Sequence, residues 1–462
     1  MRSTTNVPYV LFLGATAALG GLLFGFDIAI ITGAGPFLME RFRLDDLSLG
    51  WAFSSLLFGC VLGSAAAGRL TDTYGRRGVL LWVAGLFAVT SLGSGLAPSF
   101  GWFILFRLLG GIAVGGASIL APLYVAEVSP AAMRGRMGTL YQLSIVIGIL
   151  ISYVINYQLH DLGAWNWRWM FISGVVPSVA FFALLLPAPE TPRYLFRAGR
   201  EKEAFDLLKR IDGHDRAVAE LEQIRASLAV AGGSLKEFFK PGLRRAMGVG
   251  FVLAILVHVS GINTVIDYAP TILKSAGWKI DAALFSTFVI GVVNFLFTLV
   301  SFWVIDRYGR KVLYITGSIG MAIVLAALTA AAALGCFQGG IVLGLLLAYI
   351  AFFAACIGPV FWTLVPEIFP NRVRGLAMSV PVLTQWVANA MMVLFFPVAF
   401  NQLGKVPTFT FLAVMALTQA LFTWRLVPET KGLSLEEIEA LWRRPVKEAA
   451  KPGSSPEAGG VE

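Results

Sequence analysis

Long apolar runs separated by short polar turns extend along most of the chain. Each run has about 20 or more residues, the length at which one helix crosses the hydrocarbon core of a bilayer. A charged segment at about 188–245 divides the runs into two groups of six. The pattern predicts twelve membrane-spanning helices, and therefore an all-α membrane protein. The runs cover residues 9–34, 50–70, 78–97, 101–126, 137–159, 167–187, 246–273, 281–305, 312–335, 339–365, 375–400 and 406–427.

The charged segment between the two groups has a different pattern. In Arg200–Ile211 and Ala217–Leu228, charged residues alternate with Ala and Leu at helical spacing, which is typical of short amphipathic surface helices. The chain is therefore expected to comprise an N-terminal six-helix bundle, a cytoplasmic linker, a C-terminal six-helix bundle, and a cytoplasmic tail that is mostly disordered at its end. These parts are predicted at residues 1–187, 188–245, 246–427 and 428–462, respectively.

Composition excludes a soluble globular enzyme. Of 462 residues, 57% are hydrophobic and 14% are charged, and the mean hydropathy is +0.76. Ordinary soluble proteins have roughly 25% charged residues. Walker A, His-Glu-x-x-His and Cys-x-x-Cys motifs are all missing from the sequence, and its three cysteines have neither metal nor disulfide spacing. We therefore expect a protein that is not an enzyme and needs no metal or cofactor.

The net charge of +9 could indicate nucleic acid, but its distribution indicates membrane topology instead. Lys and Arg are concentrated in alternate loops, as the positive-inside rule requires when both termini are cytoplasmic. A nucleic-acid-binding motif is lacking. A cleavable signal peptide and an Asn-x-Ser/Thr sequon are also lacking, which favours the plasma (inner) membrane of a prokaryote.

Three motifs occur twice in the chain. Gly75 is echoed by Gly309 (offset 234), Glu127 by Glu367 (offset 240), and Pro189 by Pro428 (offset 239). The near-constant offset indicates that the two groups of helices are copies of one unit. The sequence therefore predicts two pseudo-symmetric six-helix bundles.

Two charged residues lie inside apolar runs. Asp27 lies in the first run and Arg107 near the middle of the fourth. Each charge costs several kcal/mol in lipid unless it faces a cavity or a partner, so the two are candidates to pair. A pair whose distance changes with helix movement could load and release a proton, and a static ion pair between two helices is the alternative.

The seventh and tenth runs are interrupted by residues that weaken helices. These are Gly261 and Pro270 in the seventh run, and Gly358, Pro359 and Pro366 in the tenth. Interrupted helices are tolerated in membranes only where they line a cavity. The two runs are thus expected to border the substrate pathway and to act as gates.

Taken together with further motifs, these residues resemble those of the sugar porter family of the major facilitator superfamily. The sequence is most similar to the bacterial sugar–proton symporters of that family. The similarity extends from about Gly20 to Gly432. It rests on Gly20-Gly-Leu-Leu-Phe-Gly-Phe-Asp27, Arg107…Gly110-Gly111, Pro189-Glu-Thr-Pro-Arg193, Ser260-Gly-Ile-Asn263, Gly358-Pro-Val-Phe-Trp362, Pro366-Glu-Ile-Phe-Pro370, Gln385-Trp386 and Pro428-Glu-Thr-Lys-Gly432.

The resemblance implies a function and its alternatives. It implies the major facilitator fold, a functional monomer, and import of a monosaccharide (hexose or pentose) together with protons by alternating access. A facilitative sugar uniporter and a carrier of polyols or cyclic organic acids share that fold. A membrane nutrient sensor is a further alternative, although the tail after Lys431 is short for one.

The resemblance also implies roles for individual residues. Asp27 and Arg107 would couple transport to protons, and Gly261, Tyr268, Gly358 and Pro359 would act in gating. Side-chain amides and aromatic rings suit a polyhydroxylated ring, although each one alone is compatible with an ordinary position inside a helix bundle. The residues matched to sugar contacts are Phe24, Gln142, Asn263, Asn294, Trp362, Gln385 and Trp386.

The sequence departs from the family at two places near this site. Val257-His258 replaces a usual Gln-Gln pair, and Asp267-Tyr268 replaces two tyrosines. His258 is open to three interpretations: a helix histidine satisfied by its surroundings, a sugar ligand, or a second titrating group. Asp267 is interpreted as a structural or water-facing acid, with a role in coupling as the alternative.

Repeated acids and arginines between the runs resemble the family's cytoplasmic charge clamp. Positive-inside charge alone would explain the arginines but not the acids between them. Thr73 replaces an arginine that often follows Asp72, which predicts a weaker clamp in the first half. The clamp would comprise Asp72, Arg77, Glu127, Arg134 and Glu190 in the first half, and Asp306, Arg310, Glu367, Arg374 and Glu429 in the second.

Overall fold

The first half of the chain forms six membrane-length helical segments. A computed structural model describes residues 5–130, 133–229, 241–369 and 374–431. The first half comprises α1 (Val7–Phe42), α2 (Asp46–Tyr74), α3 (Arg76–Leu96), α4 (Phe100–Val128), α5 (Arg134–Leu159), and a sixth segment made of η1 (Gly163–Trp165), α6 (Asn166–Ile172) and α7 (Val175–Leu185).

The second half also forms six such segments, two of which are interrupted. The seventh consists of α11 (Pro241–Val259), α12 (Ile262–Asp267) and α13 (Ala269–Ser275), and the tenth of α16 (Gly339–Cys356) and α17 (Gly358–Glu367). The others are α14 (Ile280–Tyr308), α15 (Arg310–Ala333), α18 (Arg374–Val398) continued by η3 (Ala399–Leu403), and α19 (Lys405–Leu426).

The structure confirms twelve candidate membrane spans among the described residues, which contain no β-strand. Several helices are longer than the apolar runs that predicted them. α1 extends to Phe42 rather than residue 34, and α2 begins at Asp46 rather than residue 50. Outside the lipid, capping residues decide where a helix begins or ends. Asp45 is the N-cap of α2, because its side chain accepts a hydrogen bond from the backbone N–H of Ser48.

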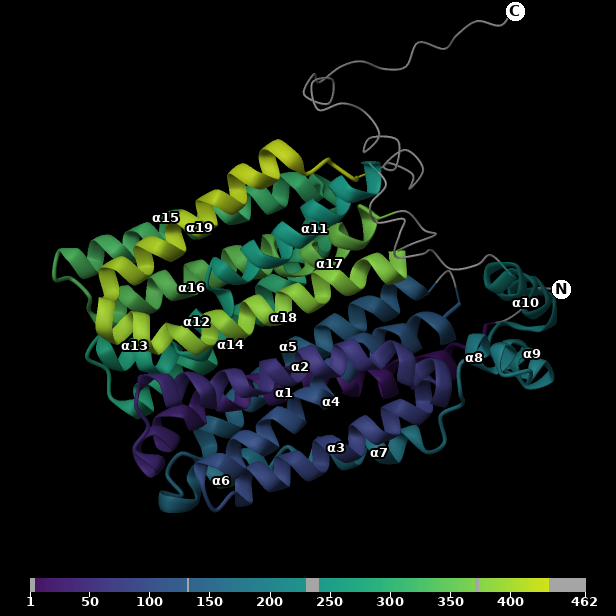
Figure 1. The fold of residues 1–462 in the computed structure, drawn as a ribbon, viewed down its shortest axis with the longest axis horizontal. Coiled ribbons are helices and arrows are strands. Elements are labelled where there is room, and N and C mark those ends of the chain that lie inside the picture. The colour runs from purple at the N-terminus through teal and green to yellow at the C-terminus, as the bar shows by residue number, and fades with distance from the viewer. Residues whose placement is uncertain (1–4, 131–132, 230–240, 370–373, 432–462) are drawn as a thin grey trace, which may run out of the picture.

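Three short helices lie between the halves in sequence: α8 (Pro192–Arg197), α9 (Glu201–Asp212) and α10 (His214–Ala229). α9 and α10 match the two predicted amphipathic helices, and α8 was not predicted. They lie together at one end of the helix bundle, at the right in Figure 1, which we name the linker end; the opposite end is the far end. The predicted division at residues 187, 245 and 427 stays a prediction, and residues 432–462 of the predicted tail lie outside the described part.

Equivalent helices pack in the same way in both halves. α2 packs on α4 and α1 on α5 in the first half, as α14 packs on α16 and α11 on α18 in the second. The contacts between the halves are also paired, because α2 packs on α18 and α5 packs on α14. Figure 1 shows the two halves as two layers of long helices. The internal repeat predicted from the sequence is therefore present in the packing.

Glycines allow the closest approaches between helices. A Cβ at Gly59 would lie 2.1 Å from the carbonyl oxygen of Leu108, and one at Gly111 would lie 1.9 Å from that of Leu56. Side chains larger than hydrogen would force α2 and α4 apart. The two glycines thus allow close packing of α2 against α4.

Contacts between the halves gather at the far end. A Cβ at Gly50 on α2 would lie 1.9 Å from the Leu394 carbonyl oxygen on α18, and Asn401 donates to Asp46 at 2.6 Å. On the other side of the interface, the ring of Tyr157 packs edge-on against that of Phe285 at 5.7 Å. The halves are therefore closed against each other at the far end.

Candidate functional site

An arginine on α4 and an aspartate on α1 form an ion pair inside the first half. Nη1 of Arg107 lies 2.9 Å from Oδ1 of Asp27 and also donates to the Asp27 backbone carbonyl at 3.1 Å. Arg107 is 2% exposed and Asp27 is 8% exposed. The structure thus brings together the two charges that the sequence places in separate apolar runs.

The arginine of this pair is only partly satisfied. Its guanidinium lies over the Phe171 ring at 5.3 Å, and its Nε and Nη2 have no hydrogen-bond partner among the described residues. Buried donors without partners cost about 1–3 kcal/mol each, which favours exchange of partners when the helices move. Asp267 of α12 is also buried and interacts electrostatically with Arg107. Arg107 is therefore within electrostatic reach of two acids, Asp27 in its own half and Asp267 in the other half.

An aromatic and amide cluster lies where the halves meet. The rings of Phe24 on α1 and Trp386 on α18 are 5.8 Å apart, and the imidazole of His258 on α11 interacts with the Gln385 side chain on α18. Nε1 of Trp386 and Nδ1 of His258 are buried without partners among the described residues. Such atoms can bind the hydroxyl groups of a ligand, and together they combine an aromatic face with donors and acceptors.

Among the described residues, no hydrogen bond or ring contact links the remaining residues matched to sugar contacts to this cluster. Gln142 on α5 and Asn263 on α12 are half-buried, and Asn294 on α14 is buried. Trp362 on α17 is 38% exposed, and its ring packs edge-on against Phe361 at 5.6 Å. The structure therefore pairs Phe24 with Trp386 and His258 with Gln385, and a role of the other four in sugar binding stays a prediction.

The predicted interruption of the seventh span lies at Gly261. Its φ of +95° belongs to the left-handed region, where glycine is favoured, and it separates α11 from α12. The Ser260 carbonyl freed by the break accepts a hydrogen bond from the Tyr349 hydroxyl of α16 at 2.8 Å. A buried carbonyl is thereby satisfied without a continuous helix.

Tyr268, between α12 and α13 of the same span, contacts both halves near the far end. Its ring stacks on Phe53 of α2 at 4.4 Å and on Phe396 of α18 at 5.2 Å. Its hydroxyl donates to the carbonyl of Val393 at 3.0 Å. Because these partners belong to both halves, separation of the halves at the far end must break part of this stack.

The second interruption lies at the junction of α16 and α17. α16 ends at Cys356 and α17 begins at Gly358, with Pro359 at the start of the new helix, where its missing N–H costs nothing. Both predicted breaks are therefore present as helix junctions.

At the linker end, a carboxylate caps the start of α3. Glu190 accepts hydrogen bonds from the backbone N–H groups of Arg76 and Arg77 at 2.9–3.1 Å. A Cβ at Gly75 would lie 2.2 Å from Oε2 of Glu190, and Gly75 has a φ of +80°. This explains why a glycine precedes α3.

The second half repeats this cap. Glu429 accepts from the backbone N–H groups of Arg310 and Lys311 at 3.0 and 3.1 Å, at the start of α15. A Cβ at Gly309 would lie 2.7 Å from Oε2 of Glu429. The same side-chain chemistry thus serves both copies of the repeat.

The ion pairs beside these caps require one correction to the predicted clamp. Glu127 pairs with Arg76 at 3.0 Å, and Glu367 pairs with Arg310 at 3.2 Å. Arg77 instead donates to the backbone carbonyls of Leu185 and Leu186. Because Gly75 is equivalent to Gly309, the residue equivalent to Arg310 is Arg76. Applying the repeat offset to the arginines would have identified it.

Of the other predicted clamp residues, Asp72 forms an ion pair with the linker. Asp72 pairs with Arg197 of α8 at 2.5 Å on an exposed surface. The side chains of Arg134, Asp306 and Arg374 lie outside the described part of the structure. Each described pair joins segments of the same half or its linker, so the described clamp does not join the two halves.

Replacing Glu190 with Gln is expected to destabilise the protein by about 2 kcal/mol, because hydrogen bonds to a charged acceptor contribute more than those to a neutral one. Thermal unfolding of the purified protein should show a lower Tm, and Glu429→Gln should behave in the same way. Glu203→Gln is the matched control, because Glu203 forms an exposed pair with Arg200. An unchanged Tm in both cap variants would show that the caps contribute nothing.

Comparison with known proteins then identifies the family. Residues 13–442 match the family model described as "Sugar (and other) transporter". The chain belongs to this family of sugar transporters. It is 38% identical to the arabinose-proton symporter of Bacillus subtilis, over 95% of this chain and 96% of that protein, and 36% identical to the major myo-inositol transporter of the same organism, over 96% of each.

A solved structure of a family member agrees with this assignment. The inward-open xylose transporter XylE of E. coli matches with a TM-score of 0.83 and 34% identity, over 94% of this chain and all of that one. The major facilitator fold with two six-helix bundles is thus confirmed, as is a multi-pass membrane protein. The relatives in this family are transporters rather than enzymes, as the sequence predicts.

Proposed function

We propose that this protein imports a monosaccharide together with protons across the membrane by alternating access. The observation that carries the proposal is the buried Asp27–Arg107 pair on α1 and α4, with an aromatic and amide cluster built from α1, α11 and α18. The name of the related arabinose-proton symporter supports the same chemistry. The pair would handle the proton and the cluster would bind the sugar.

Asp27 would act as the proton carrier and Arg107 as its switch. When Arg107 pairs with Asp27, the carboxylate is stabilised in its charged form and releases the proton. When the helices move apart, a buried and unpaired carboxylate binds a proton instead. Because α1 contacts both the partner arginine and the aromatic cluster, sugar binding and protonation would depend on the same helix.

The proposed orientation places the linker end in the cytoplasm, with both termini on that side. The concentration of Lys and Arg in the loops of that side supports it. Closure of the far end then corresponds to an inward-facing state, in agreement with the inward-open structure that the chain resembles. We further propose a monomer in the inner membrane of a prokaryote, surrounded by lipid.

A panel of candidate ligands, each added to the purified protein, tests which substrate it binds. A ligand that binds the native state raises apparent stability, so arabinose, xylose and glucose are expected to raise the Tm of the purified protein. A cyclic polyol is the second candidate, because His258 and Asp267 replace the usual residues and a myo-inositol transporter is among the relatives. Stabilisation by myo-inositol and by none of the sugars would replace the monosaccharide with the polyol.

Gln385→Ala is expected to weaken sugar binding about 30-fold, since the lost hydrogen bonds to hydroxyl groups contribute about 2 kcal/mol. Binding of the best sugar of the panel, followed by isothermal titration calorimetry, measures the effect. Gln419→Ala is the matched control, because Gln419 is also buried but lies on α19, outside the helices that build the cluster. Equal losses in both variants would place Gln385 outside the sugar site.

A further inference from the structure

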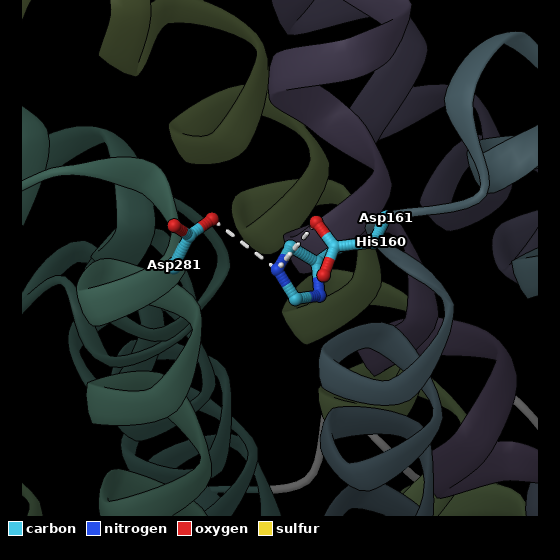
Figure 2. A group of neighbouring side chains, drawn as sticks. All are labelled: His160, Asp161 and Asp281. Atoms are coloured by element: carbon cyan, nitrogen blue, oxygen red, sulfur yellow. Dashed lines mark ion pairs between the residues drawn. The ribbon is translucent and has the colours of Figure 1, made fainter.

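Three side chains converge across the far end of the interface between the halves. His160 follows α5 of the first half, Asp161 is its neighbour in the chain, and Asp281 lies in the first turn of α14 in the second half. Nε2 of His160 lies 3.2 Å from Oδ1 of Asp161 and 3.2 Å from Oδ1 of Asp281. Figure 2 shows this nitrogen facing both carboxylates, with an ion pair drawn to one oxygen of each.

The imidazole is held so that Nε2 carries a lone pair in its neutral form. Nδ1 of His160 bonds to the backbone carbonyl of Tyr157, and a carbonyl can only accept, so Nδ1 carries the hydrogen. The ring also stacks on that of Tyr157 at 5.5 Å, and Tyr157 packs against Phe285 of α14. Metal-ligating histidines are usually oriented in this way, with one ring nitrogen bonded to a carbonyl and the other directed at the metal.

A cation between the three atoms resolves the electrostatics of the cluster. A neutral Nε2 lone pair facing two carboxylate oxygens is repulsive unless a cation lies between them. Two ligands bound tetrahedrally at about 2.05 Å lie about 3.3 Å apart, close to the two distances of 3.2 Å. One ligand atom from each residue lies within 4.8 Å of the others.

We propose that His160, Asp161 and Asp281 form a binding site for a transition-metal dication such as Zn²⁺ that bridges the two halves. The imidazole favours transition metals over Mg²⁺, and the exposed carboxylates leave room for water as a fourth ligand. The site is complete only when α5 and α14 are close at the far end, so the bound ion stabilises that state and opposes its opening.

Calorimetric titration of the purified full-length protein with ZnCl₂ at neutral pH tests the site without any transport measurement. We expect one Zn²⁺ per chain, and an affinity at least 10-fold to 100-fold lower in His160→Ala and in Asp281→Asn. His214→Ala is the matched control, because His214 also lies beside an aspartate, Asp215, but on α10 at the linker end. It should bind Zn²⁺ as the wild type does, and MgCl₂ should give no comparable binding.

Several results would overturn the site. These are the absence of Zn²⁺ binding, retention of wild-type affinity in His160→Ala, and an equal loss in His214→Ala. Wild-type affinity in Asp281→Asn would contradict the bridge between the halves.

The conformational consequence rests on the proposed function and has its own readout. Zn²⁺ added to the far-end face of proteoliposomes should slow sugar exchange in the wild type and not in Asp281→Asn. If Zn²⁺ binds as expected but no sugar is exchanged by any form of the protein, the proposed transport fails while the metal site stands. If Zn²⁺ binds and exchange in the wild type is unaffected, the proposed stabilisation of the closed far end is wrong.

Discussion

Replacing Asp27 with Asn is expected to abolish sugar accumulation while sparing sugar exchange. A proton that enters with the sugar carries one charge, which draws about 2.3 kcal/mol from 100 mV and sustains roughly 50-fold accumulation. Asn cannot release a proton, so the gradient no longer drives the cycle and accumulation should fall to about onefold. Proteoliposomes with an imposed proton gradient, compared with counterflow without one, measure the two quantities separately.

The matched control is Asp215→Asn, because Asp215 is exposed on α10 and far in sequence from the pair. It should accumulate sugar as the wild type does. Thermal unfolding of Asp27→Asn shows whether the variant folds, since Arg107 loses a charged partner in the interior. A folded Asp27→Asn protein that still accumulates sugar would remove Asp27 from coupling.

Gly50→Val is expected to slow transport by about 100-fold without preventing sugar binding. The new Cβ would lie 1.9 Å from a backbone oxygen of α18, so α2 and α18 cannot close at the far end as they do here. A cost of about 3 kcal/mol to the closed state corresponds to about a 100-fold change in its population. The protein should remain open at the far end, where sugar can still enter.

Counterflow and sugar binding, measured on the same preparation, separate closure from affinity. Gly85→Val on α3 is the matched control, because a Cβ at Gly85 would have no atom within 4 Å. It should transport sugar at the wild-type rate. If Gly50→Val transports as fast as Gly85→Val, the contact between α2 and α18 is not part of the transport cycle.

The long-range features of the fold follow from the sequence because lipid leaves few alternatives. In a bilayer, an apolar run of about 20 residues must satisfy its own backbone and becomes a helix, and the repeat offsets relate the two halves. The Gly261 and Gly358 breaks could be predicted for the same reason. The ends of α1 and α2 could not, because they lie outside the apolar runs and depend on local caps.

The candidate site could be predicted in part. Asp27 and Arg107 each need a partner in lipid, so their pairing follows from their chemistry. Arg76 rather than Arg77 could also be predicted, because the offset that relates Gly75 to Gly309 relates Arg76 to Arg310. The cluster of His160 and Asp281 joins residues far apart in sequence and depends on closure of the far end, which the sequence alone does not specify.

The central claim, that Asp27 carries a proton into the cell with each sugar, is tested most directly by following pH outside proteoliposomes. Sugar added to wild-type vesicles in weak buffer should make the external medium more alkaline as protons enter with it. The same addition to Asp27→Asn vesicles should leave the pH unchanged although sugar still equilibrates. Sugar entry into wild-type vesicles without any alkalinisation, or an equal change in Asp27→Asn, would contradict the account.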